Sequence, residues 1–411
     1  MWSGFLDHPI VWTYSIFLGA VWLSRLLAAA LHMNKIAEIT GPEYDVPPVD
    51  ASGQVPRVSI IVPARNEAEH IEAALLSLLR LDYADYEVIV VNDRSEDATA
   101  VIIDRLQTQW REKAEGPHRL LKVLHVTELP PGWLGKTHAM WLAGKQAAGD
   151  WLLFTDADVV FRSDALRRAM GYAERERADH LVLFPTLVMK SVGERMMQAF
   201  FQSQFVFAHR PWKVSDPKSR DAIGVGAFNF IRREVYEKLG TYQRLRMAVL
   251  DDMKLGEVVK KEGYHQRIVF GYDLLRLRWV FGAAGMIRNL TKNFFAILRY
   301  NTAFALLAVL GILVVNLGPF VGLVVATGWS YIGYVLALLA LSLIYVGMSW
   351  HSDIPPIYVI LHPIGAILFT YAIVLSVVLT LVRGGVVWRG TWYSLAELRK
   401  FSREEPGWNW F

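Results

Sequence analysis

Short apolar runs alternate with stretches of helical spacing in the first half of the chain. Runs of β-branched and aliphatic residues predict four strands, at residues 58–62, 86–91, 121–126 and 151–155. Apolar residues at helical spacing between these runs predict helices at residues 67–79, 97–110 and 136–148. Because strand–helix alternation of this kind is typical of right-handed βαβ units, we expect an α/β domain with a mostly parallel sheet.

Four longer apolar segments predict helices that cross a membrane. The first runs from residue 9 to 31, and three more lie at residues 301–327, 329–350 and 356–382. Each is long enough to span a hydrocarbon core of roughly 30 Å. Asp7 precedes the first segment, whereas Arg25 and Lys35 lie at its far end. The positive-inside rule therefore puts the N-terminus outside and the following domain in the cytoplasm. A cleaved signal peptide is the alternative, but its positive charge should come first.

The C-terminal tail carries conflicting signals about its side of the membrane. Three spans after a cytoplasmic domain would put the tail outside, whereas its basic residues favour the inside: Arg383, Arg389, Arg399, Lys400 and Arg403. A re-entrant last segment would remove the conflict, and His362, Pro363 and Gly365 interrupt that segment. Before the second span, basic and apolar side chains alternate, which predicts an interfacial amphipathic helix.

Composition narrows the functional classes. The chain of 411 residues is 53% hydrophobic and has no cysteine, which excludes disulfides and thiolate metal sites. Its formal net charge is +4. In a chain with apolar spans, this charge predicts attraction to the anionic headgroups of membrane lipids rather than binding to nucleic acid. The sequence does not indicate an oligomeric state.

Three polar motifs follow predicted strands or open predicted helices. PARNE brings Pro63, Arg65 and Glu67 to the end of the first strand, and VNDRS brings Asp93 to the end of the second. The carboxyl edge of an open α/β sheet is where nucleotides bind. GWLGK ends in Lys136 at a helix start, where an ammonium group can pair with a diphosphate. Each motif has a plainer interpretation as a loop that caps the next helix.

Two pairs of carboxylates carry the strongest chemical signal. TDAD ends the fourth strand with Asp156 and Asp158. Two carboxylates this close repel each other unless a cation neutralises them, and Mg²⁺ or Mn²⁺ bridging nucleotide phosphates is the natural cation. LDDMKL brings Asp251 and Asp252 to a helix start. These two are either helix caps or the general base that takes a proton from an attacking hydroxyl.

The motifs PARNE, VNDRS, GK, TDAD, GAFNFIRRE and LDDMKL occur in this order. In this order they resemble the inverting glycosyltransferases of family 2, which have the GT-A fold, a Rossmann-like nucleotide-diphospho-sugar transferase domain. Among these, the chain is most similar to membrane-bound enzymes such as ceramide glucosyltransferase and the hopanoid-associated glycosyltransferases. The tail RGGVVWRGTWY, residues 383–393, resembles the ends of such enzymes. The resemblance implies a hexosyltransferase that uses a nucleotide-diphosphate sugar, with a UDP-sugar expected.

The resemblance also implies roles for individual residues. Pro63, Arg65 and Glu67 would contact the nucleotide, and Asp93 would lie near its base or ribose. Lys136 would lie near the nucleotide or diphosphate, and Asp156 would contact the sugar nucleotide. Asp158 would ligate the metal. Asp252 would be the catalytic base, with Asp251 in the place that a glutamate usually holds.

One element departs from this pattern. Processive and ceramide-type relatives carry Gln/Arg-x-x-Arg-Trp after the base, and here Arg278 and Trp279 are preceded by Leu275 where Gln or Arg is expected. Arg278 and Trp279 are therefore alternatively an interface anchor. In that case Arg288 or Lys292 would supply the positive charge at the diphosphate.

We therefore expect an integral membrane enzyme, in the inner membrane if bacterial, that transfers a sugar to a lipid or lipid-linked acceptor at the cytoplasmic face. The expected parts are an N-terminal anchor (1–34), a linker (35–55), a GT-A domain (56–285), an interfacial helix (286–300), transmembrane helices (301–382) and a basic, tryptophan-rich tail (383–411). The alternatives are a processive polysaccharide synthase, a non-catalytic membrane scaffold with the same fold, and a nucleotidyltransferase.

Overall fold

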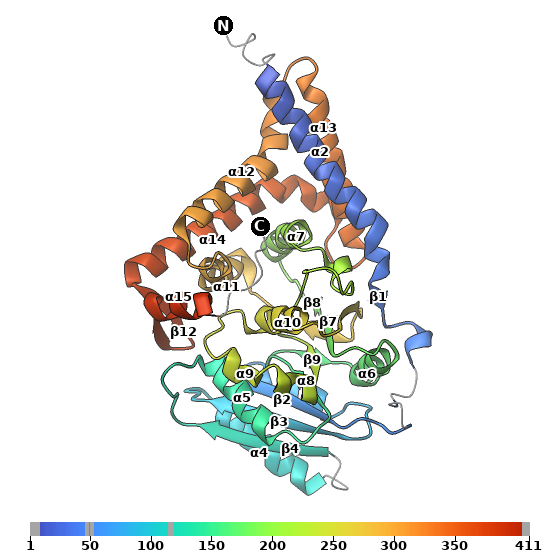
Figure 1. The fold of residues 1–411 in the computed structure, drawn as a ribbon, viewed down its shortest axis with the longest axis vertical. Coiled ribbons are helices and arrows are strands. Elements are labelled where there is room, and N and C mark those ends of the chain that lie inside the picture. Colours follow the sequence, from blue (N-terminus) through green and yellow to red (C-terminus); the bar gives the residue numbers. More distant parts are fainter. Residues whose placement is uncertain (1–8, 46–48, 50–52, 114–118, 405–411) are drawn as a thin grey trace.

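A computed structural model describes residues 9–45, 49, 53–113 and 119–404 of the chain. Its central feature is an eight-stranded sheet in the lower half of Figure 1. In spatial order the strands are β1 (Ala37–Glu38), β10 (Gln266–Phe270), β7 (His180–Phe184), β9 (Asn229–Arg232), β5 (Trp151–Phe154), β2 (Val58–Ala64), β3 (Tyr86–Asp93) and β4 (Arg119–Val126). Parts of the expected anchor, linker and tail, residues 1–8, 46–48, 50–52 and 405–411, lie outside the described residues.

The sheet is mostly parallel, as the strand–helix alternation predicts. Strands β2, β3 and β5 are buried along their whole length, which explains why they read as continuous apolar runs. Strand β9 is the exception, because it lies antiparallel between β5 and β7. Its insertion brings the loop before it, which contains Gly224 and Gly226, beside the end of β5.

Helices cover both faces of the sheet. One face packs against α3 (Ile71–Leu78), α4 (Thr99–Lys113) and α6 (Ala165–Arg175). The other packs against α5 (Gly135–Gln146), α8 (Arg233–Lys238), α9 (Thr241–Arg244) and α10 (Asp251–Lys261). A small second sheet of β6 (Val160–Phe161), β11 (Leu275–Leu277) and β8 (Thr186–Leu187) lies beside the main one. The helix expected from residue 67 begins only at Ile71, because the backbone of Asn66 and Glu67 donates instead to Ser95 and Thr99 of the neighbouring loop.

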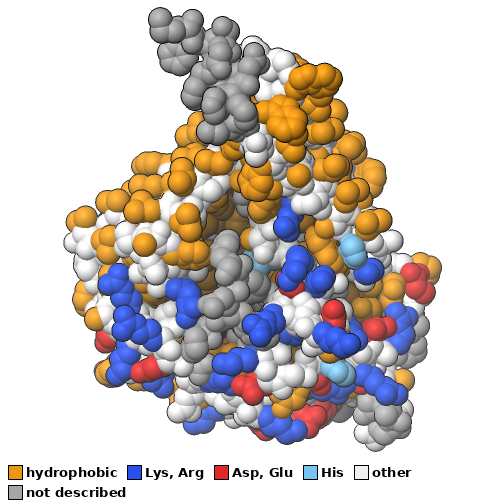
Figure 2. Space-filling model, turned by 45° about the horizontal axis from the view of Figure 1, so that its top comes forward, with side chains coloured by type: hydrophobic (Ala, Val, Ile, Leu, Met, Phe, Trp, Pro, Cys, Tyr) orange, Lys and Arg blue, Asp and Glu red, His pale blue; other side chains and the backbone are white. Residues whose placement is uncertain are grey.

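An arm of apolar helices rises from this domain. Helices α2 (Pro9–His32), α12 (Thr302–Val325) and α13 (Ser330–Ser349) form the arm at the top of Figure 1. Among the described residues, four helical segments are long and apolar enough to cross a membrane, these three and Pro356–Arg383. Figure 2 shows apolar side chains over the arm and Lys and Arg side chains gathered below them. This separation is the one expected where a bilayer core meets its headgroup layer.

The last long helix runs a different course. Helix α14 (His362–Arg383) follows a short turn, η4 (Pro356–Leu361), and crosses the base of the arm in Figure 1. It packs against α11 (Gly282–Ile297) and α7 (Val192–Ala208), which lie between the arm and the sheet. His362 and Pro363 stand in its first turn, so they begin the helix and do not interrupt it. Helix α11 begins four residues earlier than the interfacial helix expected at 286–300.

The tail returns to the sheet domain. After α14, the strands β12 (Gly385–Trp388) and β13 (Thr391–Ser394) form a hairpin, and α15 (Leu395–Glu404) follows. Thr391 Oγ1 accepts a hydrogen bond of 3.3 Å from Arg94 Nη1, on the loop after β3. The hairpin therefore lies beside the loop that follows β3, at the carboxyl edge of the sheet.

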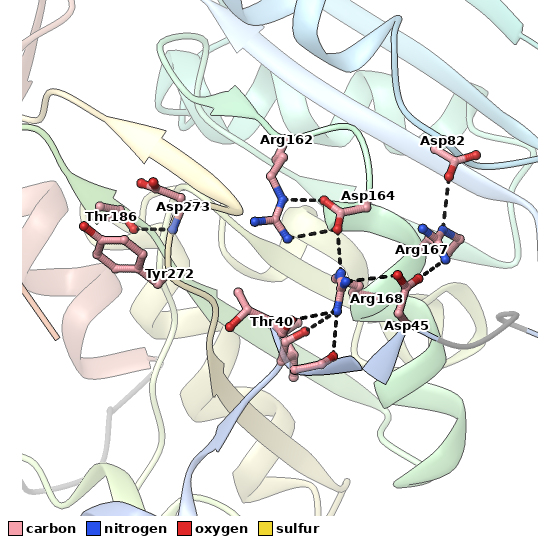
Figure 3. Close-up of polar contacts among 12 residues, drawn as sticks. Thr40, Asp45, Asp82, Arg162, Asp164, Arg167, Arg168, Thr186, Tyr272 and Asp273 are labelled. Atoms are coloured by element: carbon pink, nitrogen blue, oxygen red, sulfur yellow. Dashed lines mark hydrogen bonds and ion pairs between the residues drawn. The ribbon is translucent and has the colours of Figure 1, made fainter. Parts of the chain in front are cut away.

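Arg168 on α6 fastens the linker that follows the first apolar helix. Its guanidinium donates to the carbonyl oxygens of Ile39, Thr40 and Gly41 at 2.8–3.1 Å, and it also pairs with Asp164 (Figure 3). Strand β1 then pairs with β10 and extends the main sheet into the linker. The position of helix α2 is thereby tied to the sheet domain and does not depend on a loose tether.

Candidate functional site

Asp156 and Asp158, which follow β5, lie at the centre of the site. The backbone amide of Asp156 donates to the carbonyl of Gly226 at 3.0 Å, which joins the end of β5 to the loop before β9. A side chain at Gly226 would collide with the Asp156 carboxylate, so this close approach requires glycine. Parallel strands β2 and β3 end at the same edge and bring their loops toward Asp156.

Lys136 connects the two predicted carboxylate pairs. It stands in the first turn of α5, and its Nζ lies 2.9 Å from Asp156 Oδ1 and 3.4 Å from Asp251 Oδ1. Burial alone would raise the pKa of Asp156, but Lys136 beside it lowers that pKa overall. Burial lowers the pKa of Lys136, but the surrounding aspartates raise it by more, so the net pKa is raised. Both groups are therefore charged at neutral pH.

Within the described part of the chain, no Lys or Arg side chain forms an ion pair with Asp158. Burial, followed by the charges of Asp156 and Glu67, raises the pKa of Asp158 to about 7. Among the residues that the structure describes, no three His, Asp or Glu side chains are close enough to hold a metal ion by themselves. The excess negative charge at Asp158 nevertheless fits a hard divalent cation that takes its other ligands from phosphates and water.

The second carboxylate pair opens α10. Asp252 Oδ1 accepts a hydrogen bond of 2.8 Å from the backbone amide of Met253. Asp251 is almost fully buried and faces Lys136. Burial raises the pKa of Asp251 to about 7. Lys136 opposes this rise, and the charges of Asp252 and Asp156 add to it. Burial also raises the pKa of Asp252. A carboxylate with a raised pKa is a better proton acceptor near neutral pH than an ordinary aspartate.

These residues line one large cavity of about 2730 Å³. Seven of the residues predicted for the site contribute to its wall: Arg65, Glu67, Lys136, Asp156, Asp158, Asp251 and Asp252. The same cavity continues between the helices of the arm, where Leu26, Ile312 and Ile344 line it. A polar site at the edge of the sheet is thus continuous with an apolar space between α2, α12 and α13.

The structure places two predicted nucleotide contacts elsewhere. Pro63 is buried inside β2, where it pairs with Val91 of β3. Asp93 is fully buried and pairs with the guanidinium of Arg94 at 2.7 Å. Neither residue lines the large cavity. Their assignment to the nucleotide stays a prediction.

The structure shows where three basic residues lie whose roles could not be decided from the sequence. Arg278 pairs with the buried carboxylate of Glu194 at 3.0 Å, so it anchors the start of α11 to α7, and Trp279 packs against Phe201. Lys292 lines the cavity from α11. Arg389, from the tail hairpin, lines it as well, a position that residue spacing did not reveal. The one available signal was the WRG stretch of the tail, which resembles family members but had no assigned role.

Comparisons with known proteins bear on the family and the fold of this domain. Residues 59–240 match the family model described as Glycosyl transferase family 2. The chain is 26% identical over 242 residues to poly(ribitol-phosphate) beta-N-acetylglucosaminyltransferase TarS of Staphylococcus aureus, covering 54% of this chain and 39% of that protein. It is 28% identical over 209 residues to the beta-monoglucosyldiacylglycerol synthase of Synechocystis sp., covering 47% and 42%. The matches therefore span less than half the length of either relative.

A solved structure shares the fold. The mannosyltransferase PcManGT of Pyrobaculum calidifontis, solved in complex with GDP-Man and Mn²⁺, superposes with a TM-score of 0.51 at 21% identity. The match covers 90% of this chain and 99% of that one. Together with the sheet order, this likeness confirms the expected GT-A fold.

Proposed function

Since residues 59–240 form a family 2 glycosyltransferase domain, we propose that this glycosyltransferase moves a sugar from a nucleotide diphosphate to a lipid or lipid-linked acceptor, with inversion. The supporting observation is the cavity that runs from Asp156 and Asp252 into the apolar space between α2, α12 and α13. A water-soluble acceptor would not need an apolar approach of this kind. A lipid can keep its tail among these helices while its polar head reaches the carboxylates.

The donor would lie along the carboxyl edge of the sheet. Lys136 is held there by Asp156 and Asp251, and Arg65 and Glu67 line the same wall. PcManGT was solved with GDP-Man and Mn²⁺, which supports a nucleotide sugar and a divalent metal in this fold. Asp158 would hold the Mg²⁺ or Mn²⁺, with Asp156 contacting the sugar nucleotide. When bound, that ion would stabilise the negative charge on the leaving diphosphate.

Asp252 is the proposed general base. Asp251 is held by Lys136, whereas Asp252 forms no ion pair within the described residues and lines the cavity. The acceptor hydroxyl would give its proton to the Asp252 carboxylate as its oxygen forms a bond to the anomeric carbon. The bond from that carbon to the diphosphate oxygen breaks at the same time, and the diphosphate leaves with the electron pair. Attack from the opposite face inverts the anomeric configuration.

We place the domain at the cytoplasmic face of the membrane. Arg25 and Lys35 lie at the C-terminal end of the first apolar segment, next to the sheet domain. The surface below the arm is also rich in Lys and Arg (Figure 2). In a bacterium this would be the inner membrane. The tail hairpin would lie on the same side, with α14 along the interface.

The test uses full-length protein in membranes with a panel of labelled nucleotide sugars. Asp252→Asn removes the proton acceptor while keeping the shape of the side chain, and transfer should fall about 10²- to 10⁴-fold. Asp104→Asn, at an exposed position of α4, is the matched control and should transfer normally. Retained nucleotide binding by Asp252→Asn would show that the protein is folded. Transfer by a folded Asp252→Asn protein at the wild-type rate would refute the base assignment, and a retained anomeric configuration would refute inversion.

A further inference from the structure

The hairpin formed by β12 and β13 ends in an unusual turn. Its two central residues, Arg389 and Gly390, both have positive φ, +47° and +72°. Two-residue turns of this kind favour Asn, Asp or Gly at the first position, and a long side chain in the left-handed region is uncommon. The backbone alone therefore gives no reason for an arginine at this turn.

The turn lies against the loops at the carboxyl edge of the sheet. A Cβ atom added to Gly390 would lie 2.9 Å from Arg65 Nη2, on the loop after β2. Thr391 accepts its hydrogen bond from Arg94, on the loop after β3. The C-terminal hairpin thus closes the donor side of the cavity, although about 300 residues of chain separate it from these loops.

Arg389 brings its guanidinium from the tail hairpin to the wall of the cavity. Its Nη1 is buried and, within the described residues, has no hydrogen-bond partner. Burial lowers the pKa of Lys292, the nearby charges of Arg389 and Lys136 lower it further, and the carboxylates of Asp156 and Glu67 oppose this only in part. Arg389 and Lys292 line the same cavity as Asp156, so both cations lie at the predicted donor site. A buried guanidinium nitrogen without a partner, beside a second cation on the same wall, can donate to an anion that enters the cavity.

Arg278, the basic residue that the sequence pattern suggested for the diphosphate, is already paired. It is neutralised by Glu194, and its guanidinium lies over the ring of Phe281 at 4.2 Å. Lys136 is already shared between Asp156 and Asp251. Among these basic residues, Arg389 and Lys292 form no ion pair within the described residues, although the charges of Glu67 and Asp156 lie near them.

We propose that the tail hairpin completes the donor site, and that Arg389, assisted by Lys292, binds the diphosphate of the sugar nucleotide. This inference rests on the proposed function. A guanidinium can donate two parallel hydrogen bonds to phosphate oxygens, which an ammonium cannot do in the same way. The site should therefore distinguish nucleoside diphosphates from monophosphates through the tail as well as through Lys136.

Calorimetric titration of the full-length protein in detergent tests this inference. The ligands are UDP, GDP and dTDP with the corresponding monophosphates, each with and without Mn²⁺. Arg389→Gln should weaken the binding of the preferred diphosphate by about 10- to 100-fold, the loss expected for one or two hydrogen bonds to a charged group. The affinity for the monophosphate should stay almost unchanged. Arg389→Lys should lie between wild type and Arg389→Gln. Arg383→Gln, which removes an exposed charge at the end of α14, is the matched control and should bind as wild type does.

The possible outcomes separate this inference from the function on which it rests. If the wild-type protein bound none of the diphosphates, the proposed function would fail first. If it bound one of them and Arg389→Gln bound it equally well, only the inference would be overturned. Tighter binding by Arg389→Gln would also overturn it, because the hairpin would then obstruct the donor. If Arg389→Gln does not fold, Arg389→Lys decides the question: a smaller preference for diphosphate supports the inference, and an unchanged preference refutes it.

Discussion

Replacing Lys136 with methionine should leave two carboxylates in the site without their counter-charge. Lys136 lies 2.9 Å from Asp156 and 3.4 Å from Asp251, and its own side chain is 11% exposed. Methionine has a similar length and keeps the packing, so the main change is electrostatic. Breaking a buried ion pair by removing one partner costs about 3–5 kcal/mol.

The expected loss of stability in Lys136→Met lies at the lower end of that range. The side chain of Asp156 is 34% exposed and water can solvate much of its charge, whereas that of Asp251 is only 5% exposed. We therefore expect a loss of about 3 kcal/mol, mainly from Asp251. For a domain of this size the loss corresponds to a fall in Tm of roughly 6–12 °C.

The pH dependence of the stability loss in Lys136→Met shows whether the loss is electrostatic. The pKa of Asp251 is already raised to about 7 with Lys136 present, and it should rise further without it. A carboxyl whose folded-state pKa is raised destabilises the fold when it is charged, so the deficit should be largest above that pKa and shrink as pH falls through it. Thermal unfolding of the detergent-solubilised protein at about pH 8.5 and about pH 5.5 measures this difference.

The matched control is Lys145→Met, which removes an exposed lysine from the same helix. Its Nζ lies over the ring of Trp141 at 4.7 Å, and its loss should change Tm only slightly. A Lys136→Met protein as stable as wild type at high pH would refute the electrostatic argument. So would a deficit of the same size at both pH values.

Three further predictions concern the linker, the metal site and the pH dependence of transfer. Arg168→Gln should lower the Tm, because it removes the donor to three carbonyl oxygens of the linker, a loss of about 3 kcal/mol. Arg80→Gln, at an exposed position, should leave the Tm unchanged. If the two variants melted at the same temperature, Arg168 would not stabilise the linker. Asp158→Asn should abolish the dependence of sugar transfer on Mg²⁺ or Mn²⁺, and an unchanged metal titration would exclude Asp158 as the ligand. The rate of transfer should fall with decreasing pH before the pH reaches the range of an ordinary aspartate, because burial raises the pKa of Asp252 and a protonated carboxyl cannot accept a proton. A rate that stays flat down to about pH 4 would argue against a carboxylate base with a raised pKa.

Much of the sheet and its edge could be predicted from local patterns. The runs at β2, β3 and β5 are continuous because these strands are buried on both faces, and parallel strands end at one edge. That geometry alone brings Asp156 and Asp158 close to the loop that carries Arg65 and Glu67. Strand β9 could not be predicted in its antiparallel place, because its position depends on pairing across the sheet and not on its own four residues.

The basic residues of the site were harder to predict because their positions depend on contacts between distant segments. Arg278 looks available in the sequence, but it is neutralised by Glu194, 84 positions away. Arg389 follows an apolar helix and reads as a flanking positive charge. It reaches the cavity only because α14 crosses the base of the arm and returns the chain to the sheet domain (Figure 1). Spacing along the chain carries no information about that course.

The central claim is that the cavity joining the carboxylates to the apolar arm admits a lipid acceptor. The most direct measurement incubates membranes that contain the protein with labelled nucleotide sugars, and then separates organic-solvent extract from polymer and water-soluble fractions. Our account predicts that the label appears in the lipid extract with wild-type protein and with Asp104→Asn, and is nearly absent with Asp252→Asn. Label that appears only in long polymer or in a water-soluble product would contradict it.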